Sequence, residues 1–374
     1  MKILTHIARI LVGILFIFSG FVKADDPLGF AYKLQEYFEV FGMNFFIPFS
    51  LSLSIFFCAL ETLLGFMLLF GTRTKLTLWL LSAVILFFTF LTFYTAHYNK
   101  VTECGCFGDA IPMTAWQSFW KNIALVVLIL VCFIGRIHIR PIFGRKIERT
   151  FMTLAVLFSA GFPVYTYNYL PVIDFRPYAI GKNILDGMKL PPDAKTDSIQ
   201  MVFIYEKNGK QMELSVEQIK TIDSTYKFID RKDKVIREGD KPAIHDFSIV
   251  TPGDGSDYTE QILNNPNYYF FLVCYDLDKT NKNVFGKVND FAKLCRQDSV
   301  PIICLTASAD LIESFKKETA ADIDFYLTDG TQLKTMIRSN PGLMLLKNGT
   351  VIDMWHYHSF PSYSDVKEKY LSKK

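Results

Sequence analysis

Apolar residues form five long runs in the first 177 residues of the chain, whereas the remainder has only short apolar runs. A helix needs about 20 apolar residues to cross the ~30 Å hydrocarbon core of a bilayer. The five runs qualify by length, and we predict transmembrane helices over residues 7–22, 45–70, 76–97, 116–135 and 151–170.

Two basic residues, Lys2 and Arg9, precede the apolar core of the first run, as in a secretory signal peptide. However, residues 18–21, Phe-Ser-Gly-Phe, lack an A-x-A-like cleavage site. We therefore expect this segment to be retained as the first membrane helix.

The second half of the chain has the short apolar segments that are typical of a folded α/β domain. Residues 199–205 and 211–216 flank an Asn-Gly step and predict a β-hairpin within a linker of residues 171–240. Beyond residue 241, buried strands at 268–275 and 300–305 alternate with helical patterns. A sheet covered by helices is therefore predicted over residues 241–374.

The composition agrees with two different halves. The chain has 374 residues, of which 50% are hydrophobic, and seven cysteines, too few for a disulfide scaffold. The excess of Lys and Arg over Asp and Glu lies in the first half, in loops beside the predicted helices. It therefore does not indicate a nucleic-acid partner. The expected partner of this half is the lipid bilayer.

The distribution of basic residues predicts the orientation in the membrane. Lys and Arg concentrate at the N-terminus, in the turn at 73–75 and in residues 136–149, whereas the alternate loops have few. The positive-inside rule places the N-terminus in the cytoplasm and everything beyond residue 170 on the other side, which in a bacterium is the periplasm. We thus predict a multi-pass protein of the bacterial inner membrane. Four aromatic residues gather at the predicted outer interface: Tyr94, Tyr98, Trp116 and Trp120.

Three motifs in this half resemble known membrane families. Residues 18–31 and 61–73 resemble the first two helices of the DoxX family, and Gly65 and Gly71 suit close helix packing. Residues 104–109, Cys-Gly-Cys-Phe-Gly-Asp, resemble the loop of the related MauE proteins, which are implicated in making disulfides during methylamine dehydrogenase maturation. The resemblance implies a DoxX/MauE-like four-helix bundle over residues 1–140, followed by the fifth membrane helix.

Cys104 and Cys106 are the candidate redox pair, because the predicted topology places their loop in an oxidising compartment. A disulfide between residues two apart closes a small, strained ring that is easily reduced. The alternatives are a permanent loop clip or an idle pair. A metal site is disfavoured, because two thiolates without further ligands do not complete a tetrahedral set.

Two ionisable residues join the cysteines as candidate catalytic groups. His97 precedes Cys104 by seven residues; it could polarise a thiol or hydrogen-bond a quinone, or it could be an ordinary interfacial histidine. Glu61 falls near the middle of the second membrane helix, where a charge is costly and often functional. No partner for Glu61 can be named from the sequence, and a protonated carboxyl bonded across the bundle is the alternative. Cys58 and Cys132 are expected to pack between helices.

The C-terminal half carries a second resemblance. Residues 337–351 resemble the cis-proline strand and following hairpin of thioredoxins, with Pro341 as the cis-proline, and residues 246–249 resemble the opening strand of membrane-attached thioredoxin-like reductases. The two positions where such proteins carry Cys-x-x-C correspond here to Thr280 and Asn283. Neither side chain can form a thiolate, so the usual dithiol exchange is absent from this domain.

Five further residues of this domain are assigned ordinary structural roles. The three cysteines are expected to lie in the core and the two histidines on the surface: Cys274, Cys295, Cys304, His356 and His358.

Two functions remain open. In the first, a membrane thiol–disulfide oxidoreductase uses Cys104 and Cys106 to exchange electrons with a periplasmic thiol or disulfide protein and passes them to a quinone. In the second, a redox-inert membrane anchor binds a periplasmic partner through the groove near Pro341, Thr280 and Asn283. The sequence carries no cofactor motif, and a quinone is implied only by the first hypothesis.

Overall fold

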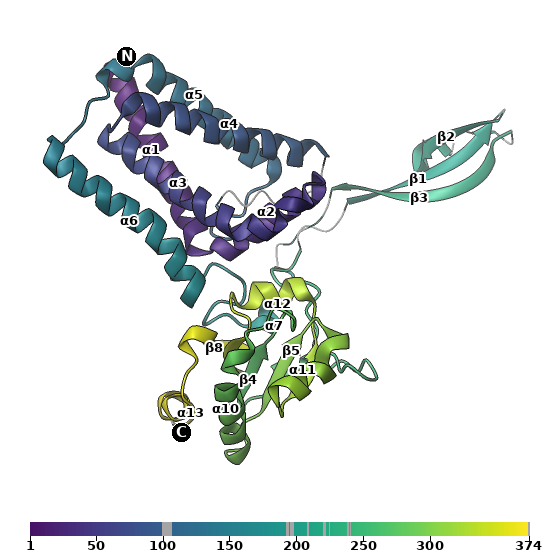
Figure 1. The fold of residues 1–374 in the computed structure, drawn as a ribbon. Helices are drawn as coiled ribbons and strands as arrows, with labels where there is room; N and C mark the ends of the chain where they lie inside the picture. Colours follow the sequence, from purple (N-terminus) through teal and green to yellow (C-terminus); the bar gives the residue numbers. More distant parts are fainter. Residues whose placement is uncertain are drawn as a thin grey trace. The chain divides into compact units, whose positions relative to one another are not determined.

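The computed structural model describes residues 1–98, 107–191, 194, 198–207, 209–219, 222–223, 225–237, 239 and 241–372 (Figure 1). The chain divides into two compact units. One comprises Met1–Lys182 together with Ser248–Lys374, and the other is Asn183–Phe247.

Five helices among the described residues are long and apolar enough to cross a membrane, as predicted. They are α1 (Lys2–Asp25), α3 (Ser50–Phe70, preceded by a 3₁₀ turn at Asn44–Phe49), α4 (Thr74–Tyr98), α5 (Ala115–Ile134) and α6 (Arg145–Tyr169). The first and last begin about five residues earlier than predicted, because polar residues occupy the helix starts. The protein is a multi-pass membrane protein.

Helices α1, α3, α4 and α5 pack into a bundle, and α6 lies against α3 (Figure 1). Glycine allows the close approach of α1 and α3, because a Cβ at Gly65 would lie 2.8 Å from the carbonyl oxygen of Gly13. Gly71, with φ of 72°, ends α3 in the left-handed conformation. The Arg9 Nε atom donates to the Leu68 carbonyl oxygen at 2.9 Å and so satisfies one of the carbonyls at the end of α3.

Helix α2 (Pro27–Val40) occupies a segment that was expected to be a loop. Asp26 caps its N-terminus by accepting from the Gly29 amide at 2.9 Å, and Pro27 takes the first helical position. Phe30, Leu34 and Tyr37 share the buried face. That face has the i, i+4, i+7 spacing of an amphipathic helix, which is a local signal for α2 in the sequence.

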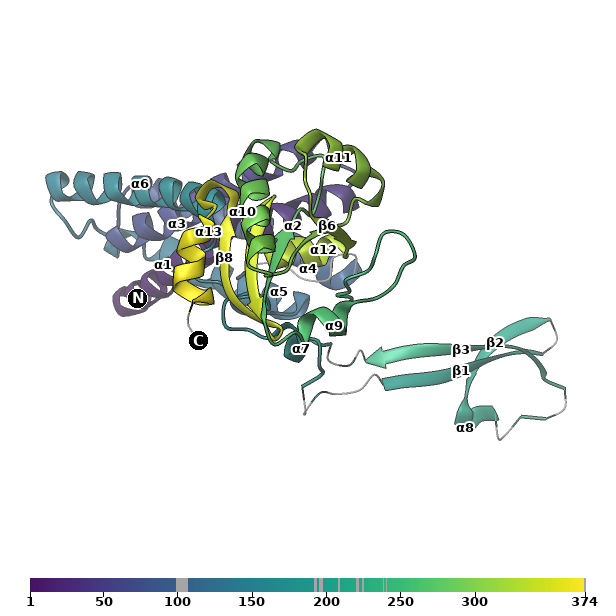
Figure 2. The same cartoon turned by 90° about the horizontal axis from the view of Figure 1, so that it is seen from below.

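The unit Asn183–Phe247 contains a small antiparallel sheet (Figure 2). The predicted hairpin is present as β1 (Ser198–Lys207) and β2 (Lys210–Ser215), with Lys207 paired to Lys210. A third strand, β3 (Lys227–Arg237), pairs with the other edge of β1 and was not predicted. Its sequence is rich in charged residues, which hides the apolar alternation of a strand. Short helices α7 (Ile184–Gly187) and α8 (Val216–Ile219) complete the unit.

The C-terminal sheet has five strands in the order β6-β5-β4-β7-β8. β4 (Tyr268–Val273), β5 (Ile302–Thr306) and β6 (Asp324–Leu327) are parallel, whereas β7 (Gly342–Lys347) and β8 (Thr350–His356) form an antiparallel hairpin beside β4. Helices accompany the sheet: α9 (Thr259–Leu263), α10 (Phe285–Gln297), α11 (Ile312–Thr319), α12 (Gly330–Met336) and α13 (Tyr363–Val366). This is the predicted α/β thioredoxin-like domain.

Three details of this domain were not predicted correctly. Strand β6 and helix α12 were not foreseen, and residues 246–249 do not form the expected opening strand. Val250 instead makes isolated bridges to Asp257 and Leu327. The edge position beside β5 is taken by β6, so no place remains there for another strand.

Candidate functional site

The membrane bundle contains a buried ion pair between α1 and α3. The Lys23 Nζ atom lies 2.8 Å from Glu61 Oε2, and the two side chains are 4% and 3% exposed. Ser19, one turn before Lys23 on α1, joins them: it accepts from Lys23 Nζ at 2.9 Å and donates to Glu61 Oε2 at 2.9 Å. Glu61 thus has the partner that the sequence did not identify.

Lys23 is well satisfied in this environment. Its amine contacts both Glu61 oxygens and lies 5.0 Å from the ring centre of Phe88 and 5.5 Å from that of Phe30. A charge without such partners would be very costly at membrane depth. The two charges are therefore stabilised inside the bundle by each other and by the neighbouring aromatic rings.

A cavity of about 30 Å³ adjoins this pair and has room for about one water molecule. Its wall includes Ser19, Lys23, Glu61, Asn122 and Phe107. Phe107 is buried, and its ring centre lies 5.4 Å from that of Phe18. Lys121 Nζ lies 4.2 Å from the ring centre of Phe107.

Cys104 and Cys106 lie outside the described residues. Phe107, however, is bonded to Cys106 in the chain. Phe107 itself is part of the wall of the cavity that Glu61 and Lys23 line.

His97 is not brought to this cavity in the part of the chain that the structure describes. It is exposed near the end of α4, where its ring stacks on Phe93 at 5.6 Å and meets Tyr98 edge-on at 4.8 Å. Trp116 and Trp120 are exposed on the first turns of α5, and Phe93 and Phe119 connect the two helices at 5.6 Å. This is the aromatic cluster expected at a membrane interface.

The thioredoxin-like domain brings the predicted Thr280 and Pro341 segments together. The Asn340–Pro341 bond is cis. The Thr280 hydroxyl donates to Asn340 Oδ1 at 2.9 Å and to the Asp276 carbonyl at 2.7 Å, and the Asn281 amide donates to the Asn340 carbonyl at 3.0 Å. Thr280 and Pro341 are buried, whereas Asn283 is exposed. A neutral hydroxyl network thus occupies the place of the usual thiols.

The three cysteines of this domain lie in the core, as predicted, and so do Cys58 and Cys132 in the bundle. All five are free. Burial raises the pKa of Cys295 to about 12 and that of Cys304 well above its usual range. These thiols are not prepared for exchange.

The prediction that His356 and His358 lie on the surface is half wrong. His358 is exposed, but His356 is only 2% exposed. His356 pairs with Gly342 across β7 and β8. Burial, and then the neighbouring His358, lower the pKa of His356 to about 4, so the ring is neutral at physiological pH.

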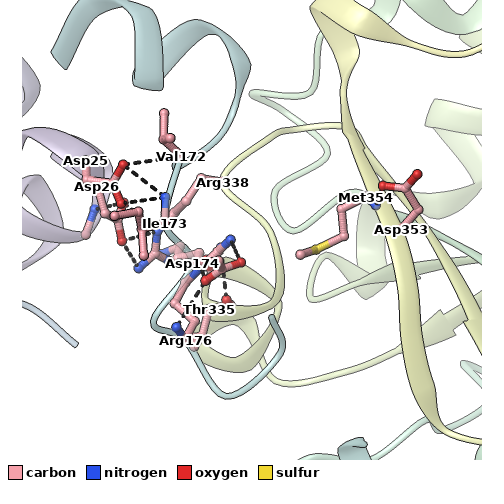
Figure 3. A network of polar contacts seen from close by, with 12 residues as sticks. Asp25, Asp26, Val172, Ile173, Asp174, Arg176, Thr335, Arg338, Asp353 and Met354 are labelled. Carbon is pink, nitrogen blue, oxygen red and sulfur yellow. Dashed lines mark hydrogen bonds and ion pairs between the residues drawn. The ribbon is translucent and has the colours of Figure 1, made fainter. Parts of the chain in front are cut away.

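A second ion pair joins the start of α2 to the loop before Pro341 (Figure 3). Arg338 Nε lies 2.9 Å from both Asp26 oxygens, and its Nη2 atom lies 2.7 Å from Asp26 Oδ2. The side chains of Arg338 and Asp26 are 8% and 22% exposed. Burial works to raise the pKa of Asp26, but the Arg338 charge holds it below its ordinary value.

Neighbouring contacts extend this junction. Asp25 accepts from the Val172 amide at 2.8 Å, and Arg176 pairs with Asp174 at 2.6 Å while donating to the Thr335 carbonyl at 3.2 Å (Figure 3). Burial works to lower the pKa of Arg338, but Asp26, and to a smaller extent Tyr32 and Asp109, raise it above its ordinary value.

Sequence reasoning missed Lys23, Asp26 and Arg338 as site residues. Asp26 and Arg338 both fall in motifs that were recognised, and Ser19 and Lys23 share one face of α1 at a spacing of four. No pattern within either motif indicates a pairing between residues 312 positions apart.

Comparisons with known proteins agree with this architecture. Residues 1–135 match the family model described as methylamine utilisation protein MauE. Residues 199–238 match a model described as a domain of unknown function, DUF8463. The chain is 23% identical over 359 residues to Protein TlpB of Flavobacterium psychrophilum, covering 92% of this chain and 89% of that protein.

The crystal structure of StoA from Bacillus subtilis also resembles part of the chain. It covers 34% of this chain and 98% of StoA, with 17% identity and a TM-score of 0.27. The first 135 residues are thus similar to MauE membrane proteins, and the C-terminal sheet agrees with the thioredoxin-like domain that the motifs predict.

Proposed function

We propose that the protein is a thiol–disulfide exchange factor of the bacterial inner membrane that uses Cys104 and Cys106. The observation that carries this proposal is the buried Lys–Glu pair beside a cavity whose wall includes Phe107, the residue that follows Cys106 in the sequence. Ionisable residues buried within membrane helices are typical of functional sites.

The reaction balances as two exchanges. A thiolate of a periplasmic protein attacks one sulfur of the Cys104–Cys106 disulfide, and the other sulfur leaves as a thiolate. The partner's second thiol then attacks the partner sulfur of the mixed disulfide and releases the cysteine of the bundle as a thiolate. The partner now carries a disulfide, and Cys104 and Cys106 are a dithiol. A quinone then accepts two electrons and two protons from this dithiol, which restores the disulfide.

The described residues have distinct roles in this proposal. The Lys23 ammonium stabilises a thiolate that forms near Phe107, because a nearby cation favours the charged form of a thiol. Glu61 accepts a proton released by the thiols. The quinone is a substrate that approaches from the bilayer, and the exposed His97 is the candidate donor to its carbonyl oxygen.

The thioredoxin-like domain has no thiol at Thr280 or Asn283 and takes no part in electron transfer. This same feature favours the second candidate function, a redox-inert anchor for a periplasmic protein. The anchor hypothesis requires an accessible groove at Pro341, whereas Pro341 and Thr280 are buried. We therefore favour the exchange function.

Trapping of the mixed disulfide tests the proposal. In the Cys106→Ser protein, purified from acid-quenched cells and separated without reductant, we expect a mixed disulfide between Cys104 and its partner. The lone Cys104 thiolate attacks the disulfide of an oxidised partner molecule, one partner sulfur leaves as a thiolate, and no Cys106 thiol is present to release Cys104 from the adduct. The Cys58→Ser protein is the matched control, since Cys58 is buried and should leave no adduct. A free Cys104 thiol with no adduct, while a known dithiol oxidase is trapped in the same cells, would overturn the proposal.

A further inference from the structure

The start of α2 contacts the thioredoxin-like domain at the residues just before Pro341 and at Tyr275. Arg338, Ser339 and Asn340 are each no more than 8% exposed. Arg338 is held by Asp26, as described above, and the Tyr32 hydroxyl donates to the Tyr275 hydroxyl at 3.4 Å.

Two kinds of contact hold the start of α2 against the thioredoxin-like domain. Arg338 and Lys334 lie 5.6 Å and 5.2 Å from the ring centre of Tyr32, so two cations face one aromatic ring. The carboxylate of Asp26 meets Arg338 through both of its oxygens, which is the strong, oriented form of an ion pair.

The packing leaves little space between the two segments. A Cβ atom at Gly29 would lie 2.9 Å from Arg338 Nη2, so only a glycine allows the guanidinium to approach this turn without displacement. Asp26 also caps α2 through the Gly29 amide. One carboxylate therefore orders the helix start and binds the neighbouring domain.

We propose that the cis-proline groove of the thioredoxin-like domain is a docking site for residues 26–32 of the same chain. The domain is an intramolecular clamp on the membrane bundle, and its ligand is a helix start that presents an aspartate and, six residues later, a tyrosine. A separate protein can use this groove only by displacing Asp26 from Arg338. This inference does not depend on the chemistry of Cys104 and Cys106.

Hydrogen exchange of the full-length protein in lipid nanodiscs tests the clamp. In Asp26→Arg and in Arg338→Asp, the amides of residues 334–343 should exchange at least about tenfold faster, because a charge-assisted pair shifts a local opening equilibrium by that factor or more. The double variant with both changes should return towards the wild-type rate. The amides of β4, Tyr268–Val273, report whether the domain stays folded.

The matched control is Arg296→Gln, which removes an ion pair with Asp322 whose side chains are 60% and 84% exposed. It should leave the exchange of residues 334–343 unchanged. Wild-type exchange in both single variants with β4 still protected, or no recovery in the double variant, would overturn the proposal.

A photo-crosslinking residue at position 32 provides a test that leaves the ion pair intact. Irradiation of the full-length protein in nanodiscs should join position 32 to the peptides that contain Tyr275 or residues 334–338. Adducts only to lipid or to another protein would show that the groove is not occupied by α2 and would overturn the clamp. Because neither measurement involves a thiol, its result is distinguishable from failure of the exchange function.

Discussion

The membrane bundle and the thioredoxin-like domain bury different kinds of polar group. The bundle holds a charged pair, Lys23 and Glu61, beside a small cavity. The thioredoxin-like domain buries neutral groups at the place of its usual thiols: the Thr280 hydroxyl and the Asn340 amide, with Cys274 and Cys304 in the core behind them. The polar groups buried at these two places are therefore charged in the bundle and neutral in the thioredoxin-like domain.

The largest expected effect is on the ion pair of the bundle. Lys23→Met or Glu61→Leu alone should lower the free energy of unfolding by about 3–5 kcal/mol, because each leaves a buried charge without its partner. The double variant should recover most of the loss. Unfolding in detergent micelles measures this effect.

The control for that experiment is Lys33→Met, which breaks an ion pair with Glu36 whose side chains are 27% and 34% exposed. It should change stability by less than about 1 kcal/mol. If the single Lys23 and Glu61 variants were equally mild, the contrast between the two regions would not hold.

The next effect concerns the neutral histidine of the sheet. The pKa of His356 is lowered to about 4, so the unfolded chain binds a proton at higher pH than the folded one. The contribution of neutral His356 to the free energy of unfolding is therefore fully present above pH ~6.5. It falls by about 3 kcal/mol as the pH approaches 4. Exchange of the β7 amides, corrected for intrinsic rates, should show this slope in the wild type. A slope that persists in His356→Gln would assign it to other groups.

The junction between the two regions should respond less strongly. Arg338→Gln should weaken docking by about 2 kcal/mol, the contribution of a hydrogen bond to a charged group. Because the folded pKa of Asp26 is lowered, the stabilisation is present above its unfolded value near pH ~3.9 and is lost as the pH falls through the folded value. The yield of the crosslink from position 32 should follow this curve. Asp26→Asn should have a low yield at every pH.

The smallest effect is an expected absence of reaction. The five cysteines in the described part of the chain are buried, so a maleimide at pH 7.5 should leave them unmodified in the folded protein. Of the seven cysteines, only Cys104 and Cys106 should react, and only after reduction of their disulfide. Labelling of Cys274 or Cys304 without denaturation would show that the thioredoxin-like domain has an accessible thiol after all.

The sequence by itself determined the elements that depend on local pattern. Long apolar runs predicted the five membrane helices, because the thickness of a bilayer demands about 20 apolar residues in succession. The motif around Pro341 predicted the thioredoxin-like hairpin. In the structure, the Asn348-Gly349 turn connects its two strands, β7 and β8. The missed helix α2 also had a local signal, in the spacing of Phe30, Leu34 and Tyr37.

Only the tertiary structure decided which charged groups meet. Lys23 and Glu61 are 38 residues apart, and Asp26 and Arg338 are 312 residues apart. Hydrophobic periodicity records which face of an element is buried, but it does not record which residues of another element lie opposite. An ion pair forms only where packing of the whole chain brings two side chains within a few ångströms in a desolvated place. For this reason Glu61 was recognised from the sequence as an unusual residue, while its partner and the docking contact of α2 emerged from the fold.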